Sequence, residues 1–481
     1  MSHTIAGYTI QSYLADLASG HVSADQVFAD YLARAKESTT NAYIKLTPDA
    51  WSALVDGGRL RGLPMAIKDN ILTKWYHTTC ASAALEKFVA PYDATCYARL
   101  RDAGIAMVGK ANLDEFAMGS SNETSFFGPV SHPLDQAYVP GGSSGWSAVA
   151  VAEDLCVAAL GSDTGGSIRL PASLCGVVGY KPTYGYVSRY GVVAMASSLD
   201  QVGTLTKNVA DAAYLTSLMW WYDHHDATSH VLGDDAFVGR DDAALLPPSD
   251  AVKEWRIALP RQFMDDGLDD DVRRVLLDLV AFLQQAGARV DEVDLPLLQY
   301  GVAVYYILMP AEVATNLARF DGIRFWHQWD SSQYATIHDY YTAMRSAAFG
   351  EEVQRRIMTG NYVLSAWFYD AYYRKAQIVR QQMIDEFSRL FGEYDMILGP
   401  TSPTVARRRG ELTDDPLRLY MMDIYTVLAN LAGLPALSLP VWSVQRDGRA
   451  WPVGAHLMAN RRQDTWLLRM ARWIEEMYPS S

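Results

Sequence analysis

The sequence has 481 residues, of which 49% are hydrophobic and 20% charged, and its formal net charge is −14. Such a chain is long and apolar enough for a large globular core, which excludes intrinsic disorder. The negative charge argues against an extensive nucleic-acid surface, because that surface would neutralise phosphates with Lys and Arg.

Short apolar runs alternate along the chain with segments of helical periodicity, which is typical of a mostly parallel sheet flanked by helices. Strands are predicted at residues 105–108, 155–160, 257–259, 396–398 and 437–441. Helices are predicted at 144–153, 209–221, 271–286 and 466–477. In the third helix one apolar stripe is expected to face the core, and its members are Val275, Leu276, Leu279, Val280 and Leu283.

Residues 222–252 are polar, acidic and proline-containing. We therefore predict a surface excursion there, within a single domain that spans residues 1–481. The excursion includes Asp223, His224 and His225, which are residue types that bind metals. We expect the adjacent histidines to point in different directions from a solvated loop, and we predict no metal site in this chain.

Cys80, Cys96, Cys156 and Cys175 have neither metal-binding spacing nor a paired framework, so we predict buried, reduced thiols. The sequence begins without a basic region followed by an apolar core, and we expect no apolar run of membrane-spanning length. These features predict a cytoplasmic protein.

Three short segments carry the candidate chemistry: residues 65–70 (MAIKDN), 141–145 (GGSSG) and 161–167 (GSDTGGS). A serine hydroxyl is a weak nucleophile until a base takes its proton, and a lysine is such a base only when burial keeps it neutral. The apolar residues 65–67 favour that state for Lys68. The sequence thus supplies a candidate base and candidate nucleophiles.

Ser167 follows an apolar run and a glycine-rich turn. We expect it near the start of a helix, where backbone N–H groups are free. The amides of Thr164, Gly165, Gly166 and Ser167 would then stabilise the oxyanion of a tetrahedral intermediate. The loss of one such donor typically costs about two to three orders of magnitude in rate.

Two rival motifs overlap this region. Residues 141–145 fit the G-x-S-x-G turn of α/β-hydrolases, but they follow a polar loop rather than an apolar strand. Residues 104–111 nearly fit a phosphate-binding loop, but their middle is apolar and Ala111 stands where a Ser or Thr would hold magnesium. We read this segment as a turn and a strand, and we expect no ATP binding by this chain.

Taken together, the three segments resemble the Ser–cisSer–Lys triad of the amidase signature family. The resemblance implies an α/β fold with a large mixed central sheet and helices on both faces. It also implies that Ser167 attacks a carboxamide carbonyl and forms an acyl ester. Ser143, after a cis peptide bond with Gly142, would relay the proton to Lys68, the base.

Five further segments resemble one subfamily, the glutaminase subunits of bacterial tRNA-dependent amidotransferases: residues 110–119 (KANLDEFAMG), 196–203 (ASSLDQVG), 319–324 (RFDGIR), 369–373 (YDAYY) and 430–435 (NLAGLP). This resemblance implies that free glutamine is hydrolysed to glutamate and ammonia, and that Tyr305, Arg356 and Asp423 recognise it. The chemistry agrees, because an arginine binds a carboxylate through two hydrogen bonds and an aspartate pairs with an ammonium group.

In this subfamily ammonia passes through a channel to a B subunit, which uses ATP and Mg²⁺ to convert Glu-tRNA(Gln) to Gln-tRNA(Gln), or Asp-tRNA(Asn) to Asn-tRNA(Asn). The resemblance therefore implies B and C partner subunits in a heterotrimer, with tRNA reached mainly through the partner. It implies no cofactor in this chain and no contact with a membrane.

Two residues depart from the family pattern. Trp146 stands where a glycine usually follows Gly145, so its ring either reshapes the pocket or packs on a neighbouring helix. His456 stands where glutamine is usual, so it either alters polar contacts near the site or is a satisfied core histidine. Two other functions stay open: a stand-alone amidase for another carboxamide, and a structural protein with impaired catalysis.

Overall fold

The computed structural model describes residues 7–53, 57–231, 251–265, 267–325, 331–412 and 415–479. Within these ranges the chain forms one sheet of eleven strands, together with fourteen α-helices. The described part of the predicted excursion before residue 232 consists of turns and irregular backbone, without helix or strand, and residues 232–250 lie outside the described ranges. The single-domain division therefore stays a prediction.

The strands are β1 (Tyr43–Leu46), β2 (Leu63–Lys68), β3 (Ile105–Ala111), β4 (Ala158–Asp163), β5 (Val178–Lys181), β6 (Gln201–Thr206), β7 (Arg256–Pro260), β8 (Arg289–Val293), β9 (Met396–Pro400), β10 (Ala436–Arg446) and β11 (Arg449–Met458).

The helices are α1 (Ile10–Ser19), α2 (Ala24–Glu37), α3 (Thr95–Asp102), α4 (Gly145–Ala152), α5 (Arg169–Cys175), α6 (Val209–Met219), α7 (Asp270–Ala286), α8 (Gly301–Leu317), α9 (Ile337–Ala348), α10 (Glu351–Leu364), α11 (Arg374–Leu390), α12 (Pro416–Met421), α13 (Val427–Ala432) and α14 (Asp464–Met477).

The sheet is mixed rather than mostly parallel. Its strand order is β1-β3-β2-β4-β6-β5-β10-β11-β9-β7-β8. The pairs β3–β2, β2–β4, β9–β7 and β7–β8 are parallel, and the other six neighbouring pairs are antiparallel. The expectation of a mostly parallel sheet is wrong, because an apolar run marks a buried strand without fixing the direction of its neighbours. The mixed sheet implied by the family resemblance is confirmed.

Helices cover both faces at the centre of the sheet. In β5, a β-carbon at Gly179 would lie 2.5 Å from the Cβ of Ala172 in α5. The next residue, Tyr180, donates a hydrogen bond from its hydroxyl to Asp464 of α14 at 2.7 Å. Because successive side chains of a strand point to opposite faces, α5 and α14 lie on opposite sides of the sheet.

All five predicted strands and all four predicted helices overlap elements of the structure. The largest shift is in the strand predicted at 155–160, because residues 153–157 belong to the turn that follows α4 and β4 begins at Ala158. The five apolar residues predicted to form a stripe on α7 are all buried. The four cysteines are also buried and unpaired, as predicted.

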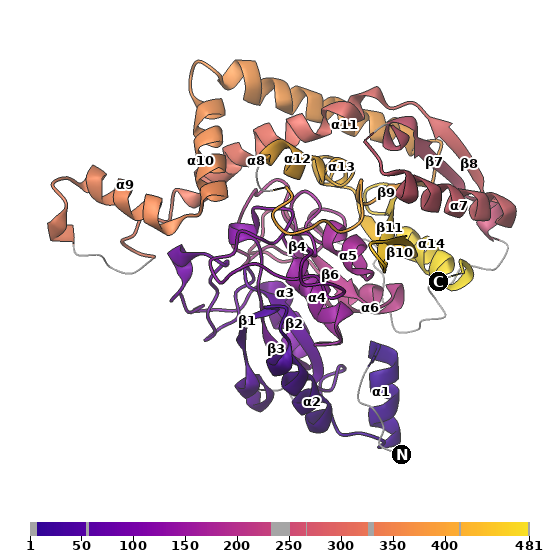
Figure 1. Cartoon of the computed structure of the whole chain (residues 1–481), viewed down its shortest axis with the longest axis horizontal. Helices are drawn as coiled ribbons and strands as arrows, with labels where there is room; N and C mark the ends of the chain where they lie inside the picture. The colour runs from indigo at the N-terminus through magenta and orange to yellow at the C-terminus, as the bar shows by residue number, and fades with distance from the viewer. Residues whose placement is uncertain are drawn as a thin grey trace.

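One helical segment, Pro296–Leu317, is long and apolar enough to cross a membrane by length and composition, contrary to the expectation from the sequence. The segment contains α8, and 56% of its most apolar window is buried inside the protein. Helices α10, α11 and α13 pack against α8, and Figure 1 shows the orange α10 and α11 close to it. Such burial is typical of the core helix of a globular domain.

Gly360 lets α10 cross α8 at close range, since a β-carbon at this position would lie 1.9 Å from the carbonyl oxygen of Pro310. We predict that Gly360→Ala lowers the free energy of unfolding by about 1–3 kcal/mol, because overpacking forces the two helices apart. Urea unfolding measures this change. Gly267→Ala, at a position with open space around it, is the control, and equal stability of the two variants would contradict the close crossing.

Candidate active site

Lys68 is the last residue of β2, and its amino group is completely buried. Its Nζ lies 2.9 Å from Ser143 Oγ, 2.8 Å from Ser144 Oγ and 3.2 Å from the carbonyl oxygen of Ser162. Burial lowers the pKa of Lys68 to about 7, and the carboxylates of Asp114 and Asp163 oppose this shift. A neutral amine is therefore populated near neutral pH.

The three oxygens around Lys68 determine which of its hydrogen bonds the amino group donates and which it accepts. The Ser162 carbonyl can only accept, and it also accepts a hydrogen bond from Ser144 Oγ at 3.1 Å. The Ser144 hydroxyl, whose hydrogen is thereby used, must accept from Lys68. Two N–H groups of a neutral Lys68 are then occupied, and its lone pair is left to accept the Ser143 proton.

Ser143 and Ser167 lie on neighbouring loops. The Gly142–Ser143 peptide bond is cis, as the family resemblance implies, and the backbone N–H of Ser144 donates to the Ser167 carbonyl at 3.0 Å. Ser167 is 8% exposed, whereas Lys68 and Ser143 are fully buried. Within the described ranges the Ser167 hydroxyl makes no hydrogen bond, so its proton transfer to Ser143 stays a prediction.

The turn that carries Ser167 connects β4 to α5. Helix α5 begins two residues after Ser167, so the predicted position near a helix start is confirmed. Gly166 has φ = 145°, which L side chains rarely adopt, and a β-carbon there would lie 2.2 Å from Thr426 Oγ1. In the described part of the chain, the amides of Gly165, Gly166 and Ser167 have no acceptor, which leaves them free for an oxyanion.

A buried ion pair closes this turn. Arg169 binds Asp163 through two hydrogen bonds of 3.0 and 2.9 Å. Asn430 donates to the Asp163 carboxylate at 2.9 Å, and Thr426 Oγ1 donates to the Gly165 carbonyl at 2.7 Å. Burial alone would raise the pKa of the Asp163 carboxyl, but Arg169 lowers it below its ordinary range.

The residues of this network, as well as Ser144, were not predicted from the sequence. Asp163 and Arg169 lie inside or next to the serine motif, so their opposite charges were the available signal. No signal in the sequence places residues 426–430 against the turn, because that contact spans more than 250 positions.

The three residues predicted to recognise glutamine come together beside the turn. A β-carbon at Gly165 would lie 2.7 Å from the hydroxyl oxygen of Tyr305, and one at Gly166 would lie 3.4 Å from Asp423 Oδ1. The Arg356 guanidinium lies over the ring of Tyr306, 5.5 Å from its centroid. The Tyr306 hydroxyl in turn donates to Asp423 Oδ2 at 3.3 Å.

Arg356 and Asp423 are both buried, although each has partners of its own. Arg356 Nε donates to Glu352 at 2.7 Å. Burial would lower the pKa of Arg356, but the Glu352 carboxylate and nearby tyrosines raise it above its ordinary value. Burial raises the pKa of Asp423 to about 7, although a hydrogen bond from Ser120 opposes this.

The two departures from the family pattern both lie in the core. Trp146 is a buried residue of α4, and its ring packs edge-on against Tyr43 with centroids 5.3 Å apart. Its backbone is helical rather than left-handed, which removes one reason to expect strain. His456 is buried in β11, and its Nε2 lies 2.8 Å from Arg169 Nη1.

Lys110, from the rival phosphate-loop motif, has a structural position. Residues 105–111 form β3, as expected for a strand and turn. The amino group of Lys110 is buried 3.1 Å from the carboxylate of Asp69 and donates to the carbonyl of Ile71 at 2.7 Å. These contacts occupy the cation that a phosphate would need.

The ligand atoms of Asp223, His224 and His225 lie within 4.8 Å of one another. The two histidine rings have centroids 3.8 Å apart, so the expectation that they point in different directions is wrong; a tight turn can place neighbouring side chains on the same side. Asp223 accepts hydrogen bonds from Thr95 at 2.5 Å and from Ser188 at 2.6 Å. The group is therefore also held as a hydrogen-bonded loop.

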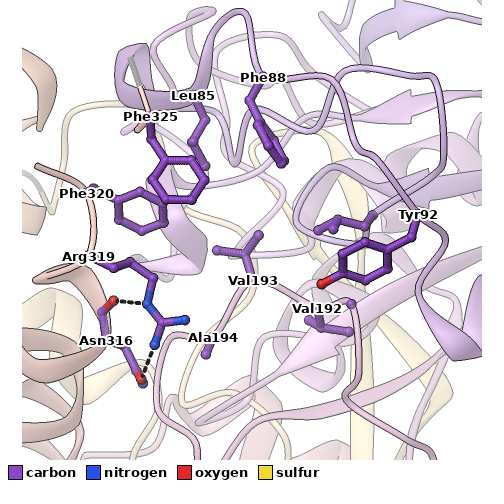
Figure 2. Close-up of a pocket in the computed structure, with 12 residues that line it drawn as sticks. Leu85, Phe88, Tyr92, Val192, Val193, Ala194, Asn316, Arg319, Phe320 and Phe325 are labelled. Carbon is purple, nitrogen blue, oxygen red and sulfur yellow. Dashed lines mark hydrogen bonds between the residues drawn. The ribbon is translucent and has the colours of Figure 1, made fainter. Parts of the chain in front are cut away.

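Arg319 and Phe320, the first two residues of the RFDGIR segment, line a cavity of about 190 Å³ with mostly apolar walls. Figure 2 shows Arg319 and Phe320 next to each other in the wall of this cavity, together with Phe88 and Val193 from other parts of the chain. Arg319 Nε donates to the carbonyl of Asn316 at 2.8 Å. No role for this segment was predicted from the sequence beyond the resemblance it carries.

We predict that a fluorophosphonate modifies Ser167 at a rate that rises as pH increases through about 7, because Lys68 loses its proton there and becomes a base. Lys68→Met removes the base and abolishes the reaction. Lys181→Met is the control, since Lys181 is also buried with its pKa lowered to about 7 but donates to the carbonyls of Pro182 and Leu434. Mass spectrometry follows the adduct, and a rate independent of pH would contradict the assignment.

Known proteins of one family match almost the whole chain. The profile of the Amidase family matches residues 27–468. A protein of Alkalilimnicola ehrlichii, named as the A subunit of glutamyl-tRNA(Gln) amidotransferase, is 45% identical over 484 residues, covering 98% of this chain and 97% of its own. A protein of the same name from Thioalkalivibrio sulfidiphilus is 46% identical, covering 98% and 97%.

Two solved structures show the same fold. The A subunit of the Thermotoga maritima glutamyl-tRNA(Gln) amidotransferase has a TM-score of 0.82 and 40% identity, with 100% of this chain and 96% of that chain covered. The peptide amidase of Stenotrophomonas maltophilia has a TM-score of 0.78 and 26% identity, with 98% and 97% covered. The chain therefore belongs to the amidase family.

Proposed function

We propose that this chain is the glutaminase subunit of a tRNA-dependent amidotransferase and hydrolyses free glutamine to glutamate and ammonia. The observation that carries the proposal is the buried pair Arg356 and Asp423, which faces the turn of Ser167 through Gly166 and Tyr306. One positive and one negative group match the α-carboxylate and α-ammonium of an amino acid.

The charges of the pocket explain how an amino acid would be oriented. In the described part of the chain, Arg356 binds Glu352 through Nε, and the one partner of its Nη1 is the thioether of Met309 at 3.7 Å. Its terminal nitrogens therefore remain for a ligand. Among the described residues, Ser120 and Tyr306 donate hydrogen bonds to Asp423, both of them to Oδ2. Its Oδ1, on the side of Gly166, remains for the ammonium group.

The reaction then follows from the three residues of the triad. Neutral Lys68 takes the proton of Ser143, which takes that of Ser167, and Ser167 Oγ adds to the γ-carboxamide carbon. The amides at 164–167 stabilise the oxyanion. When the C–N bond breaks, the relay returns the proton to the leaving nitrogen and ammonia departs. Water then hydrolyses the glutamyl ester by the same relay.

The similarity to A subunits over almost their full length supports an assembly with partner subunits. We propose partners of the B and C type, with ATP and Mg²⁺ used by the partner that amidates Glu-tRNA(Gln) or Asp-tRNA(Asn). In this assignment the chain itself supplies ammonia, needs no cofactor and works in the cytoplasm.

Two alternatives make different use of the pocket. A stand-alone amidase for an uncharged amide has no need of a buried arginine and carboxylate facing the nucleophile. A structural protein with impaired catalysis would require that Trp146 disturb the triad, whereas its ring packs in the core and Lys68 remains bound to Ser143. The geometry therefore favours the glutaminase.

A glutaminase assay of the full chain, alone and with B and C subunits, tests the proposal. We expect glutamate release from glutamine, and we expect Ser167→Ala to abolish it while leaving assembly intact. Hydrolysis of simple aliphatic or aryl amides in preference to glutamine would instead identify a stand-alone amidase. A fully active Ser167→Ala variant would contradict the nucleophile assignment.

The neighbouring residues Arg355 and Arg356 offer a matched pair of variants. We predict that Arg356→Lys raises the KM for glutamine by about tenfold to a hundredfold with a smaller change in kcat, because a lysine cannot form the paired hydrogen bonds to the α-carboxylate. Arg355→Lys is the control, because the Arg355 side chain is 42% exposed. Equal KM values for the two variants would exclude Arg356 from the substrate site.

The pH dependence of glutamine use follows from Asp423 as well as Lys68. As pH rises through about 7, Asp423 becomes a carboxylate able to pair with the α-ammonium. We therefore predict that kcat/KM rises from about pH 6 to about pH 8. In the Asp423→Asn variant, kcat/KM should still rise with pH because Lys68 loses its proton, but the part of the rise due to Asp423 should be absent. The KM for glutamine should be higher than in the parent. A profile for Asp423→Asn identical in shape and KM to the parent would rule out this role.

A further inference from the structure

Arg169 is a fully buried residue whose five N–H groups all have acceptors. Nε and Nη2 donate to Asp163 at 3.0 and 2.9 Å, and Nη2 also donates to Asn430 Oδ1 at 2.6 Å. Nη1 donates to the carbonyl of Thr426 at 2.9 Å, and its other partner is His456 Nε2 at 2.8 Å. Among the described residues, the other four acceptors of Arg169 are oxygens, and His456 supplies the one nitrogen acceptor.

Asp163 and Arg169 enclose the reactive turn. Asp163 ends β4, Arg169 begins α5, and residues 164–167 lie between them. The Asp163 carboxylate also accepts the backbone N–H of Ile168 at 3.1 Å. Any movement of the Arg169 guanidinium therefore changes the closure of the turn that carries Ser167 and the free amides.

We propose that His456 is a positioning residue. Its imidazole Nε2 accepts the one N–H group of Arg169 that the other partners leave unpaired, and this hydrogen bond keeps Ser167 and the oxyanion amides in their positions. The proposal rests on the glutaminase function, since it concerns the same turn. We expect its consequence to fall mainly on the reacting centre, because Arg169 binds Asp163 of the turn directly, whereas it is linked to Asp423, a proposed glutamine contact, through the backbone of Thr426.

The role requires an uncharged His456. Burial and the Arg169 cation lower the pKa of His456 well below its ordinary value, and Lys181 acts in the same direction while Asp163 opposes it. An imidazole whose Nε2 accepts must carry its hydrogen on Nδ1. In the described part of the chain that Nδ1 has no partner, so Arg169 is what fixes the tautomer.

Position 456 needs a hydrogen-bond acceptor for Arg169, and a side chain of similar size without an acceptor is not sufficient. A leucine at position 456 fills a comparable volume but leaves one N–H of a buried guanidinium unpaired, which a charged donor tolerates poorly. Arg169 then shifts toward other oxygens and carries the turn with it. A glutamine at this position has an amide oxygen that can accept the same hydrogen bond.

The experiment compares His456→Leu with His456→Gln in the full chain assembled with B and C subunits. Steady-state kcat and KM for glutamine are normalised to the number of active sites, counted by fluorophosphonate labelling of Ser167. We expect His456→Leu to lower kcat about tenfold to a hundredfold with KM within about threefold of the parent, since small misplacements of reacting groups cost that much. We expect His456→Gln to restore kcat to within about threefold of the parent.

Three results would overturn the proposal. His456→Leu could retain the parent kcat per active site and lose only thermal stability, which would make the residue purely structural. His456→Gln could fall as far as His456→Leu, which would exclude the acceptor as the cause. An equal rise in KM for both variants would place the effect on substrate binding.

A measurement on the unaltered chain keeps the test independent of whether the leucine variant folds. Histidine ¹⁵N NMR should assign the Nδ1–H tautomer to His456, with no titration from about pH 5 to about pH 9. An Nε2–H tautomer would contradict the proposal. If the parent labels at Ser167 but does not hydrolyse glutamine, the proposed function fails, while labelling rates of the variants still test His456.

Discussion

The structure depends on a lysine amino group that is removed from water and surrounded by hydroxyl and carbonyl oxygens. Lys68 ends a fully buried strand, and the cost of burying an ammonium group favours the neutral amine. The same burial fixes the Nζ at hydrogen-bonding distance from Ser143. Burial therefore explains both the position of the Lys68 amino group and its lowered pKa. A lysine on the surface would have neither a fixed amino group nor a lowered pKa.

The proposed nucleophile, Ser167, has the opposite requirement, because it must meet a substrate. The turn exposes Ser167 slightly. Hydrogen bonds among Asp163, Arg169 and Asn430 nevertheless fix the conformation of this turn. Such a network stabilises a single arrangement only when every donor and acceptor is satisfied. A buried lysine, a held turn and the two charged residues proposed to bind substrate thus meet where four distant parts of the chain converge.

Local pattern and long-range contact differ in how far the sequence reveals them. The amphipathic α7 could be predicted because its pattern is set by neighbouring residues, and the triad segments could be identified by their resemblance to a known family. The direction of the strands and the contacts of Arg169 with residues 426–456 could not, since they depend on topology. Trp146 shows the same limit: its sequence position left open whether the ring reshapes the pocket or packs on a neighbouring helix, and the structure packs it against Tyr43 of β1.

The proposed relay requires that Lys68 is uncharged when it accepts the proton. Lysine labelled with ¹⁵N at Nζ, followed by NMR from about pH 5 to about pH 11, measures this directly when Lys68→Met is used to assign the resonance. We expect a midpoint near 7. A midpoint close to that of an exposed lysine, about 10.4, would mean that the amino group is charged at neutral pH and would exclude Lys68 as the base.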